Sequence, residues 1–170
     1  NTLGLCNAAG SAVDASYACP NGCAGSRCLP DPSWDSCGTA PLVGEGIFTV
    51  ASYDQFTNTF TATSSGCTGT DGDSNDFFFQ VDLQANEILD VAVLSLGGEV
   101  PTVAIFTDCA DPELTCLDGD EGTTTVPASA TYQAGNAPET VYVIVDGDFS
   151  SYDEPVAVQL EKQTPDCVPG

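Results

Sequence analysis

Apolar side chains recur at every second position along residues 77–83, where four of them share one face of an extended chain: Phe77, Phe79, Val81 and Leu83. This period indicates a β-strand with one buried side. Residues 88–96 alternate in the same way, and the short polar link 84–87 separates the two runs. Because the link is short, an antiparallel hairpin is the simplest prediction for this pair.

Shorter alternating runs lie on both sides of this pair. Before it, strands are predicted over residues 46–51 and 55–63. After it, strands are predicted over residues 101–107, 123–126, 129–133, 139–146 and 154–161. No segment shows the period of a helix. These eight or nine short strands predict an all-β fold, an antiparallel two-sheet sandwich of the jelly-roll kind.

The first 43 residues have a different composition, with five of the nine cysteines and no alternating run. Such a loop-rich segment cannot bury a core unaided, so we expect disulfides to hold it. The sequence therefore predicts a cysteine-rich N-terminal arm over residues 1–43, a β-sandwich domain over 44–162 and a C-terminal tail over 163–170. Trp34 is predicted to plug the gap between arm and sandwich rather than to form a ligand platform, because tryptophan supplies a large buried area.

The charge of the chain is strongly one-sided. Its 170 residues include 2 basic and 25 acidic side chains, a formal net charge of -23. This charge cannot neutralise a phosphate backbone and is repelled by anionic membranes, which excludes nucleic-acid binding. No apolar run is long enough to span a bilayer, so no membrane insertion is expected. Divalent cations, basic partners or a saline medium suit such a chain better.

Nine cysteines indicate disulfides formed in an oxidising compartment, and the odd number leaves at least one free, modified or bonded to another chain. Four in the arm are disulfide candidates whose pairing stays open: Cys6, Cys19, Cys23 and Cys28. A zinc site over Cys19, Cys23 and Cys28 is the competing interpretation, which the absence of histidine disfavours. Cys167 either supplies a free or intermolecular thiol or closes the tail onto the arm.

The chain begins at Asn1 without a starting methionine or signal peptide, which we interpret as a mature exported form. The predicted location is therefore outside the cell, either secreted or at the cell surface.

Three stretches rich in carboxylates are candidates for calcium, which takes six to eight oxygen ligands. The candidate ligands are Asp71, Asp73, Asn75 and Asp76 in the first loop, Asp118 and Asp120 in the second, and the Asp146-Gly-Asp148 stretch. The first loop departs from a helix-loop-helix calcium site, because Asp76 stands where that motif has glycine and a strand follows. The alternative interpretation is that Asp and Gly simply form turns in an acidic protein.

Enzymatic activity is not expected from this inventory of side chains. Without histidine there is no Ser-His or Cys-His couple and no imidazole-bound metal. Paired carboxylates are the remaining catalytic option, but they need a concave site that a domain of this size has little room to form.

Several of these motifs together resemble a known secreted module. The Gly72-Asp73 loop, Asp76 followed by aromatic residues, the strand at 88–96 and the later run 141–147 are similar to the bacterial pre-peptidase C-terminal domain. The cysteines make the chain most similar to the variant found in secreted myxobacterial proteins. This resemblance covers residues 37–161 and implies a jelly-roll fold. It also implies the disulfides Cys37–Cys67 and Cys109–Cys116.

Two functions from different classes follow from these observations. The first is a non-enzymatic structural subunit of an extracellular or cell-surface assembly such as a filament, joined to copies of itself through the arm and the tail. The alternative is an extracellular binding module for polysaccharide or matrix protein that depends on calcium. The aromatic residues that a sugar platform could expose are Tyr17, Trp34, Tyr53, Tyr132 and Tyr152.

Overall fold

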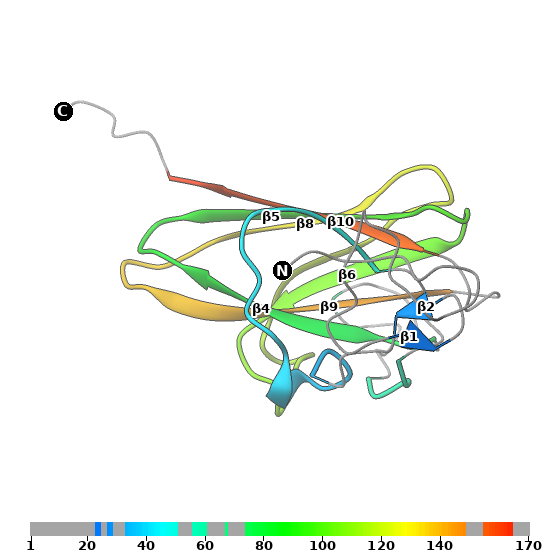
Figure 1. Ribbon diagram of the computed structural model, residues 1–170. Helices are drawn as coiled ribbons and strands as arrows, with labels where there is room; N and C mark the ends of the chain where they lie inside the picture. The colour runs from blue at the N-terminus through cyan, green and yellow to red at the C-terminus, as the bar shows by residue number, and fades with distance from the viewer. Residues whose placement is uncertain are drawn as a thin grey trace.

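The computed structural model describes residues 33–50, 56–60, 67, 74–148 and 155–164, and the backbone of two short strands, β1 and β2, within the arm (Figure 1). The strands and the one short 3-10 helix are β1 (Cys23–Ala24), β2 (Arg27–Cys28), η1 (Cys37–Thr39), β3 (Gly46–Val50), β4 (Phe77–Leu83), β5 (Ile88–Ser95), β6 (Val100–Phe106), β7 (Cys116–Glu121), β8 (Ala128–Gln133), β9 (Glu139–Asp148) and β10 (Val156–Gln163). No helix in these ranges has the length and hydrophobicity of a membrane span.

Two four-stranded antiparallel sheets face each other, with the strand orders β3-β10-β5-β8 and β4-β9-β6-β7. Figure 1 shows them as two layers. The alternating apolar residues of β4, β5, β9 and β10 point between the layers, where Phe77, Phe79, Leu89 and Val143 are fully buried. The predicted fold class, a two-sheet antiparallel β-sandwich, is confirmed.

The predicted hairpin between residues 77–83 and 88–96 is wrong. β4 pairs with β9, and β5 pairs with β10 and β8, so the link 84–87 crosses from one sheet to the other. Asn86 takes a positive φ of 64° there, a conformation that asparagine tolerates better than most residues. Alternation shows which face of a strand is buried, but it does not show whether the next strand pairs with it in the same sheet or lies in the other sheet.

Two other predicted strands are also wrong, and one strand was not predicted. Residues 56–60 are not a strand, because carboxylates rather than a neighbouring strand bind their backbone N–H groups. Residues 123–126 form a turn in which the Thr123 hydroxyl accepts the N–H of Val126 at 3.0 Å. The strand β7 was not predicted, because its sequence carries acidic residues and glycine instead of an apolar alternation.

Candidate functional site

The outer face of the sheet β4-β9-β6-β7 is covered, whereas most sandwiches of this kind leave it to solvent. Phe78, Ala104, Phe106 and Ile144 point to that face and are buried with Cys37 and Ala40 in a second apolar cluster. A strand with apolar residues on both faces needs a cover on each side. The cover consists of η1, Phe60, Cys67 and the loop between β6 and β7, which come from distant parts of the chain.

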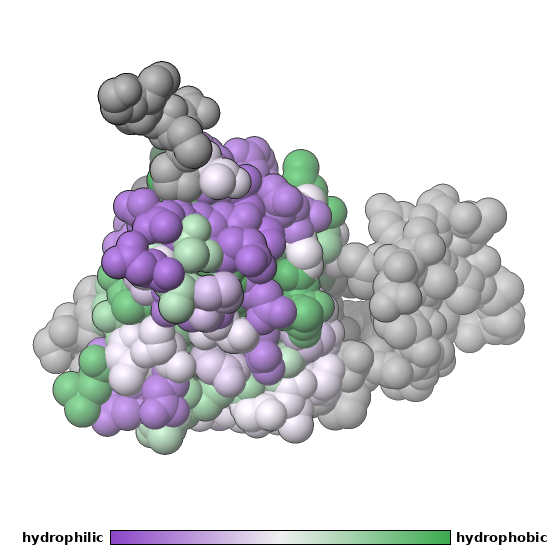
Figure 2. All heavy atoms as spheres, turned by 90° about the vertical axis from the view of Figure 1, so that its left-hand side faces the viewer, coloured by the Kyte–Doolittle hydropathy of each residue, from purple (hydrophilic) through white to green (hydrophobic). Residues whose placement is uncertain are grey.

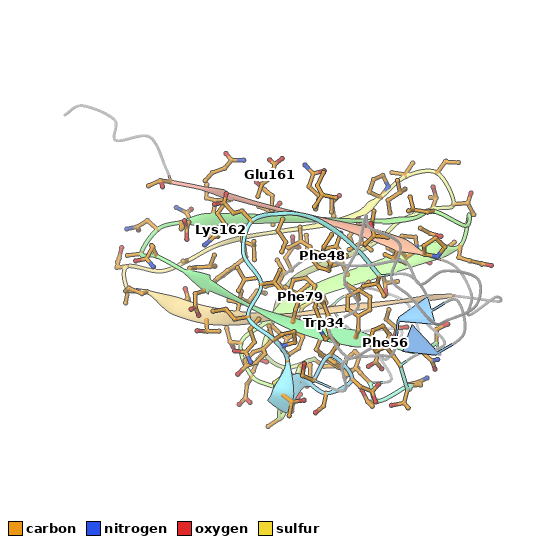
Figure 3. The ribbon with its side chains drawn as sticks, in the orientation of Figure 1. Trp34, Phe48, Phe56, Phe79, Glu161 and Lys162 are labelled. Atoms are coloured by element: carbon orange, nitrogen blue, oxygen red, sulfur yellow. A yellow bond between two sulfur atoms is a disulfide. The ribbon has the colours of Figure 1, made fainter. Side chains whose placement is uncertain are left out.

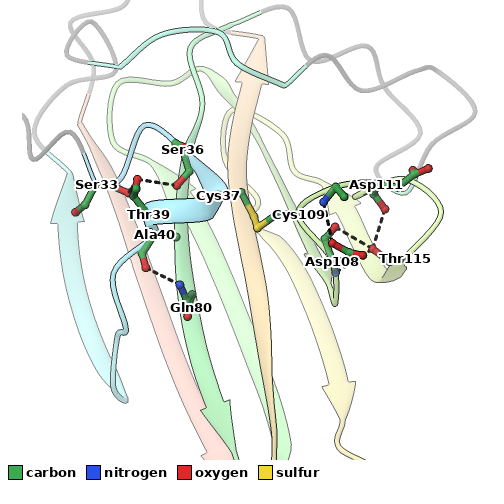
Figure 4. The surroundings of a disulfide bond; sticks show 11 residues. Ser33, Ser36, Cys37, Thr39, Ala40, Gln80, Asp108, Cys109, Asp111 and Thr115 are labelled. Carbon is green, nitrogen blue, oxygen red and sulfur yellow. Dashed lines mark hydrogen bonds between the residues drawn. A yellow bond between two sulfur atoms is a disulfide. The ribbon is translucent and has the colours of Figure 1, made fainter.

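Two disulfides hold this side of the sandwich together, one within the cover and one between Cys67 and the sheet. Cys37 in η1 is bonded to Cys109 in the loop after β6, with 5.6 Å between their Cα atoms (Figure 4). Cys67 is bonded to Cys116 at the start of β7, with a Cα separation of 5.9 Å. The Cys37–Cys109 bond closes 72 residues of chain, which in a chain-entropy model stabilises the fold by roughly 4 kcal/mol.

The disulfide pairing that the family resemblance implied, Cys37–Cys67 and Cys109–Cys116, is therefore wrong. All four cysteines are bonded, but each bond joins a segment that precedes β4 to the loop or strand that follows β6. In the loop between β6 and β7, the Asp111 carbonyl accepts the N–H and the hydroxyl of Thr115, at 3.1 and 2.8 Å. This local bonding holds the loop between Cys109 and Cys116 without a bond between the two cysteines.

The segment before β3 seals the open edge of β4. The Trp34 carbonyl accepts the N–H of Phe78 at 2.7 Å, and the Pro41 carbonyl accepts the N–H of Gln80 at 2.8 Å. The Gln80 side chain donates to the Ala40 carbonyl at 2.8 Å (Figure 4). Residues 34–43, which the sequence places in the arm, thus run along the sandwich itself.

Trp34 fills the end of the core, as the sequence predicts. Its indole ring lies 5.6 Å from the ring of Phe48, 5.9 Å from Phe77 and 6.2 Å from Phe79 (Figure 3). These separations are those of aromatic pairs in protein cores. The ring therefore packs as part of the core rather than standing free as a platform for a sugar.

Two carboxylates hold residues 56–60 in place. Asp35 accepts the N–H and the hydroxyl of Thr57. Asp76, which is fully buried, accepts the hydroxyl of Thr59 at 2.7 Å and the N–H groups of Thr59 and Phe60 at 2.8 and 2.7 Å. Burial raises the pKa of Asp76 to about 6, although these three hydrogen bonds act in the opposite direction.

Asp118 and Asp120 lie on β7 rather than in the loop that the sequence predicts. Their carboxylates reach across to the other sheet, where Asp118 accepts the N–H of Thr131 at 2.7 Å and Asp120 accepts the N–H of Ser129 at 3.1 Å. Gly119 between them packs closely, because a Cβ there would stand 3.0 Å from the carbonyl oxygen and the sulfur of Cys67. The Asp-Gly-Asp motif is thus explained by the strand and by the disulfide beside it.

The third acidic stretch is also part of a strand. Asp146 and Gly147 belong to β9 and pair with Thr102 and Pro101 of β6, so the predicted loop at 146–148 is wrong. Asp146 is buried, and its carboxylate accepts the N–H of Gly147.

The described part of the chain contains no group of three or more acidic, cysteine or histidine side chains placed to hold a metal ion. Asp76, Asp118 and Asp120 instead bind N–H groups of the chain itself, which does not fit a calcium cage. Asn75 is half-buried, whereas Asp71 and Asp73 lie outside the described residues. Calcium binding by the first loop therefore stays a prediction.

The remaining cysteine predictions fall on parts of the chain outside the described side chains, namely Cys6, Cys19, Cys23, Cys28 and Cys167. For the arm, the structure gives only the backbone pairing of β1 with β2, in which Cys23 stands opposite Cys28. Of the aromatic residues predicted to be exposed, Tyr17, Tyr53 and Tyr152 also lie outside the described ranges.

At the end of the sandwich with the links 84–87 and 134–138, hydrophilic side chains gather on the upper part of the view in Figure 2, with weakly polar and apolar ones below. Here the Lys162 ammonium group donates to the Asp82 carbonyl at 3.1 Å and lies 3.8 Å from the Glu87 carboxylate, which joins the two sheets. The Tyr132 hydroxyl donates to Glu139, and burial together with this carboxylate raises the pKa of Tyr132. The polar side chains described at this end therefore bind other groups of the same chain, as the carboxylates of Asp118 and Asp120 do.

The hollow beneath the disulfide-held cover is too small for a substrate. Phe60, Cys67, Phe106 and Ile144 are among the residues that line it, and its volume is about 10 Å³. A volume of this size accommodates at most one water molecule.

No protein-family model matches the chain, and no curated protein matches it in sequence. Among solved structures, the chain is similar to the pre-peptidase C-terminal domain of a collagenase from Bacillus anthracis. The two share 13% identity over 72% of this chain and 94% of that chain, with a TM-score of 0.46. This neighbour is of the family that the sequence resembles, and the functional proposals below depend on the chain's own residues.

Proposed function

We propose that the chain is a secreted, non-enzymatic structural subunit of an extracellular or cell-surface assembly. The observation that carries this proposal is the use of its carboxylates. Asp35, Asp76, Asp118 and Asp120 accept hydrogen bonds from the chain's own backbone and so hold the cover and the sheet edges in place. Carboxylates could act in catalysis, but these ones stabilise the fold.

The disulfides support the same proposal. They join η1 to the loop after β6 and Cys67 to β7, and such bonds form and persist in an oxidising environment. A covered face and crosslinked loops suit a subunit that must stay folded outside the cell, where chaperones do not refold it.

Size analysis of the full chain under native conditions tests this function. Sedimentation velocity from low to high micromolar concentration, with and without a reducing agent, separates the relevant states. We expect oligomers larger than one chain that increase with concentration. Species that disappear only on reduction would identify an intermolecular disulfide as the joint. A monomer at all concentrations under both conditions contradicts the proposal.

A further inference from the structure

The sandwich has four sheet edges, and the described residues protect three of them. The edge of β4 is bonded to residues 34–43, as described above. At the other side of the molecule, Asp118 and Asp120 of β7 give that edge charge and bond to the edge of β8. Natural β-sheet proteins protect their edges in these ways, because an uncovered edge is a template for another strand.

The fourth edge, β3, has none of these protections among the described residues. β3 stands last in its sheet, and the described part of the chain pairs with it only through β10. Its sequence, Gly-Ile-Phe-Thr-Val, contains no charge and no proline. The Ile47 side chain is 72% exposed, although isoleucine is usually buried.

The sheet surface next to β3 is also uncharged. Ile47 lies beside Gln159 and Ala92 on the outer face of the sheet, and Thr49 lies beside Ala157 and Leu94. The first acidic side chains near it are Glu161 and Asp90, one row further on, and Glu45, which directly precedes β3 and accepts the N–H of Lys162 at 3.0 Å. In a chain with a net charge of -23, β3 and the two described rows beside it carry no carboxylate, and the Glu45 carboxylate next to them is bonded to Lys162 of the same chain.

We propose that the β3 edge is the contact between copies of this chain, formed by antiparallel pairing of β3 with β3 of a second copy. This proposal rests on the proposed function and names its interface. Like-charged chains repel each other least where the approaching surfaces carry no charge. Pairing through β3 joins the two four-stranded sheets into one sheet of eight strands, and it supplies partners to the backbone groups of the edge.

Symmetry fixes the register of this contact. A two-fold antiparallel pairing that uses the whole of Gly46–Val50 is centred on Phe48, so Ile47 of one copy stands beside Thr49 of the other. Two β-branched side chains in this position form a favourable cross-strand pair. One short strand from each copy buries less than the roughly 1,200 Å² of a stable interface, so the association depends on concentration.

The experiment combines sedimentation with hydrogen exchange of the full-length chain at low and high concentration. We expect the amides of residues 46–50 to exchange more slowly at high concentration, while the amides of β8 do not change. Ile47→Glu should weaken the association by at least tenfold, because it places a carboxylate beside the axis. Leu114→Glu is the matched control, since Leu114 is 84% exposed and lies in the loop between β6 and β7.

The outcomes separate this interface from the function. Oligomers that form without slower exchange in residues 46–50, or that Ile47→Glu and Leu114→Glu affect equally, overturn the β3 contact and leave the structural role in place. A wild-type chain that stays monomeric overturns both. The exchange data on the wild type remain decisive if Ile47→Glu does not fold.

Discussion

The carboxylate of Asp118 accepts the backbone N–H of Thr131 at 2.7 Å, although the two residues belong to different sheets. Two residues later on β7, Asp120 accepts the N–H of Ser129, which lies two residues before Thr131 on β8. The two-residue spacing places both carboxylates on one side of β7, and the donors recur at the same spacing on β8. Asp118 and Asp120 thus take the place of the carbonyl groups that a further strand would supply.

We expect Asp118→Ala to lower the free energy of unfolding by about 1 kcal/mol, because the Thr131 N–H loses its acceptor. Asp118→Asn should retain most of this stability, since the amide oxygen still accepts a hydrogen bond. Urea unfolding measures the difference, and light scattering should show more aggregation for Asp118→Ala because the β8 edge is uncovered. Equal stability of wild type, Asp118→Asn and Asp118→Ala contradicts the role of this carboxylate.

The buried carboxyl group of Asp76 should make stability depend on pH. Its pKa is raised to about 6, so the folded chain holds this proton more tightly than the unfolded chain, where the value is 3.8. The contribution is complete below pH 3.8 and is lost as the pH rises through about 6, and it amounts to at most about 3 kcal/mol. Thermal unfolding should therefore show a Tm that falls between pH 5 and pH 7.

Two variants separate Asp76 from the general repulsion among carboxylates, which also grows with pH. Asp76→Asn should flatten the Tm profile between pH 5 and 7 and keep an acceptor for Thr59 and Phe60. Asp76→Ala should destabilise the fold by roughly 2 to 4 kcal/mol at pH 4 and by less at pH 7, because it leaves those donors without an acceptor and removes the group that titrates. A Tm profile of Asp76→Asn with the wild-type slope would show that another group titrates.

The sequence predicted most strands because burial on one side imposes a period of two, as in residues 77–83 and 139–146. It did not predict which strands pair. The apolar face of a strand is buried equally well whether the next strand pairs with it in the same sheet or lies in the opposite sheet. The strand β7 was missed for a related reason. An edge strand that carries carboxylates for a neighbouring sheet has no apolar period to recognise.

The sequence predicted the residues of the candidate site but not what their carboxylates bind. Asp76, Asp118 and Asp120 were singled out because closely spaced carboxylates suit calcium. Their acceptor role depends on donors such as Thr59 and Thr131, which lie 17 and 13 residues away in the chain and become neighbours only in the fold. The disulfide pairs were likewise not predictable, because four cysteines allow three pairings and only the fold decides among them.

Gly119→Ala should destabilise the fold by roughly 1 to 3 kcal/mol, since its Cβ would stand 3.0 Å from the Cys67 carbonyl oxygen and sulfur and from the Val103 carbonyl. Gly38→Ala is the control, because a Cβ at that position meets nothing within 4 Å. Denaturant unfolding of both variants gives the comparison. If the two substitutions change stability equally, the close packing of β7 against Cys67 is contradicted.

We expect calcium that binds through Asp71 and Asp73 of the first loop to raise the Tm of chelated protein as the calcium concentration increases. Asp73→Asn should remove this rise, because it removes one ligand charge. Asp118→Asn should leave the rise unchanged, since the carboxylate of Asp118 is bonded to β8. A Tm that does not respond to calcium counts against the site.

The disulfide pairs can be mapped by cleavage after glutamate, because Glu113 separates Cys109 from Cys116. With free thiols first alkylated at low pH, we expect the peptide 100–113 to be joined to the peptide that ends at Glu45, and the peptide 114–121 to be joined to 46–87. Mass spectrometry before and after reduction identifies each pair. A bond between 100–113 and 114–121 would instead support Cys109–Cys116, and the loop after β6 would then no longer hold η1 against the sheet.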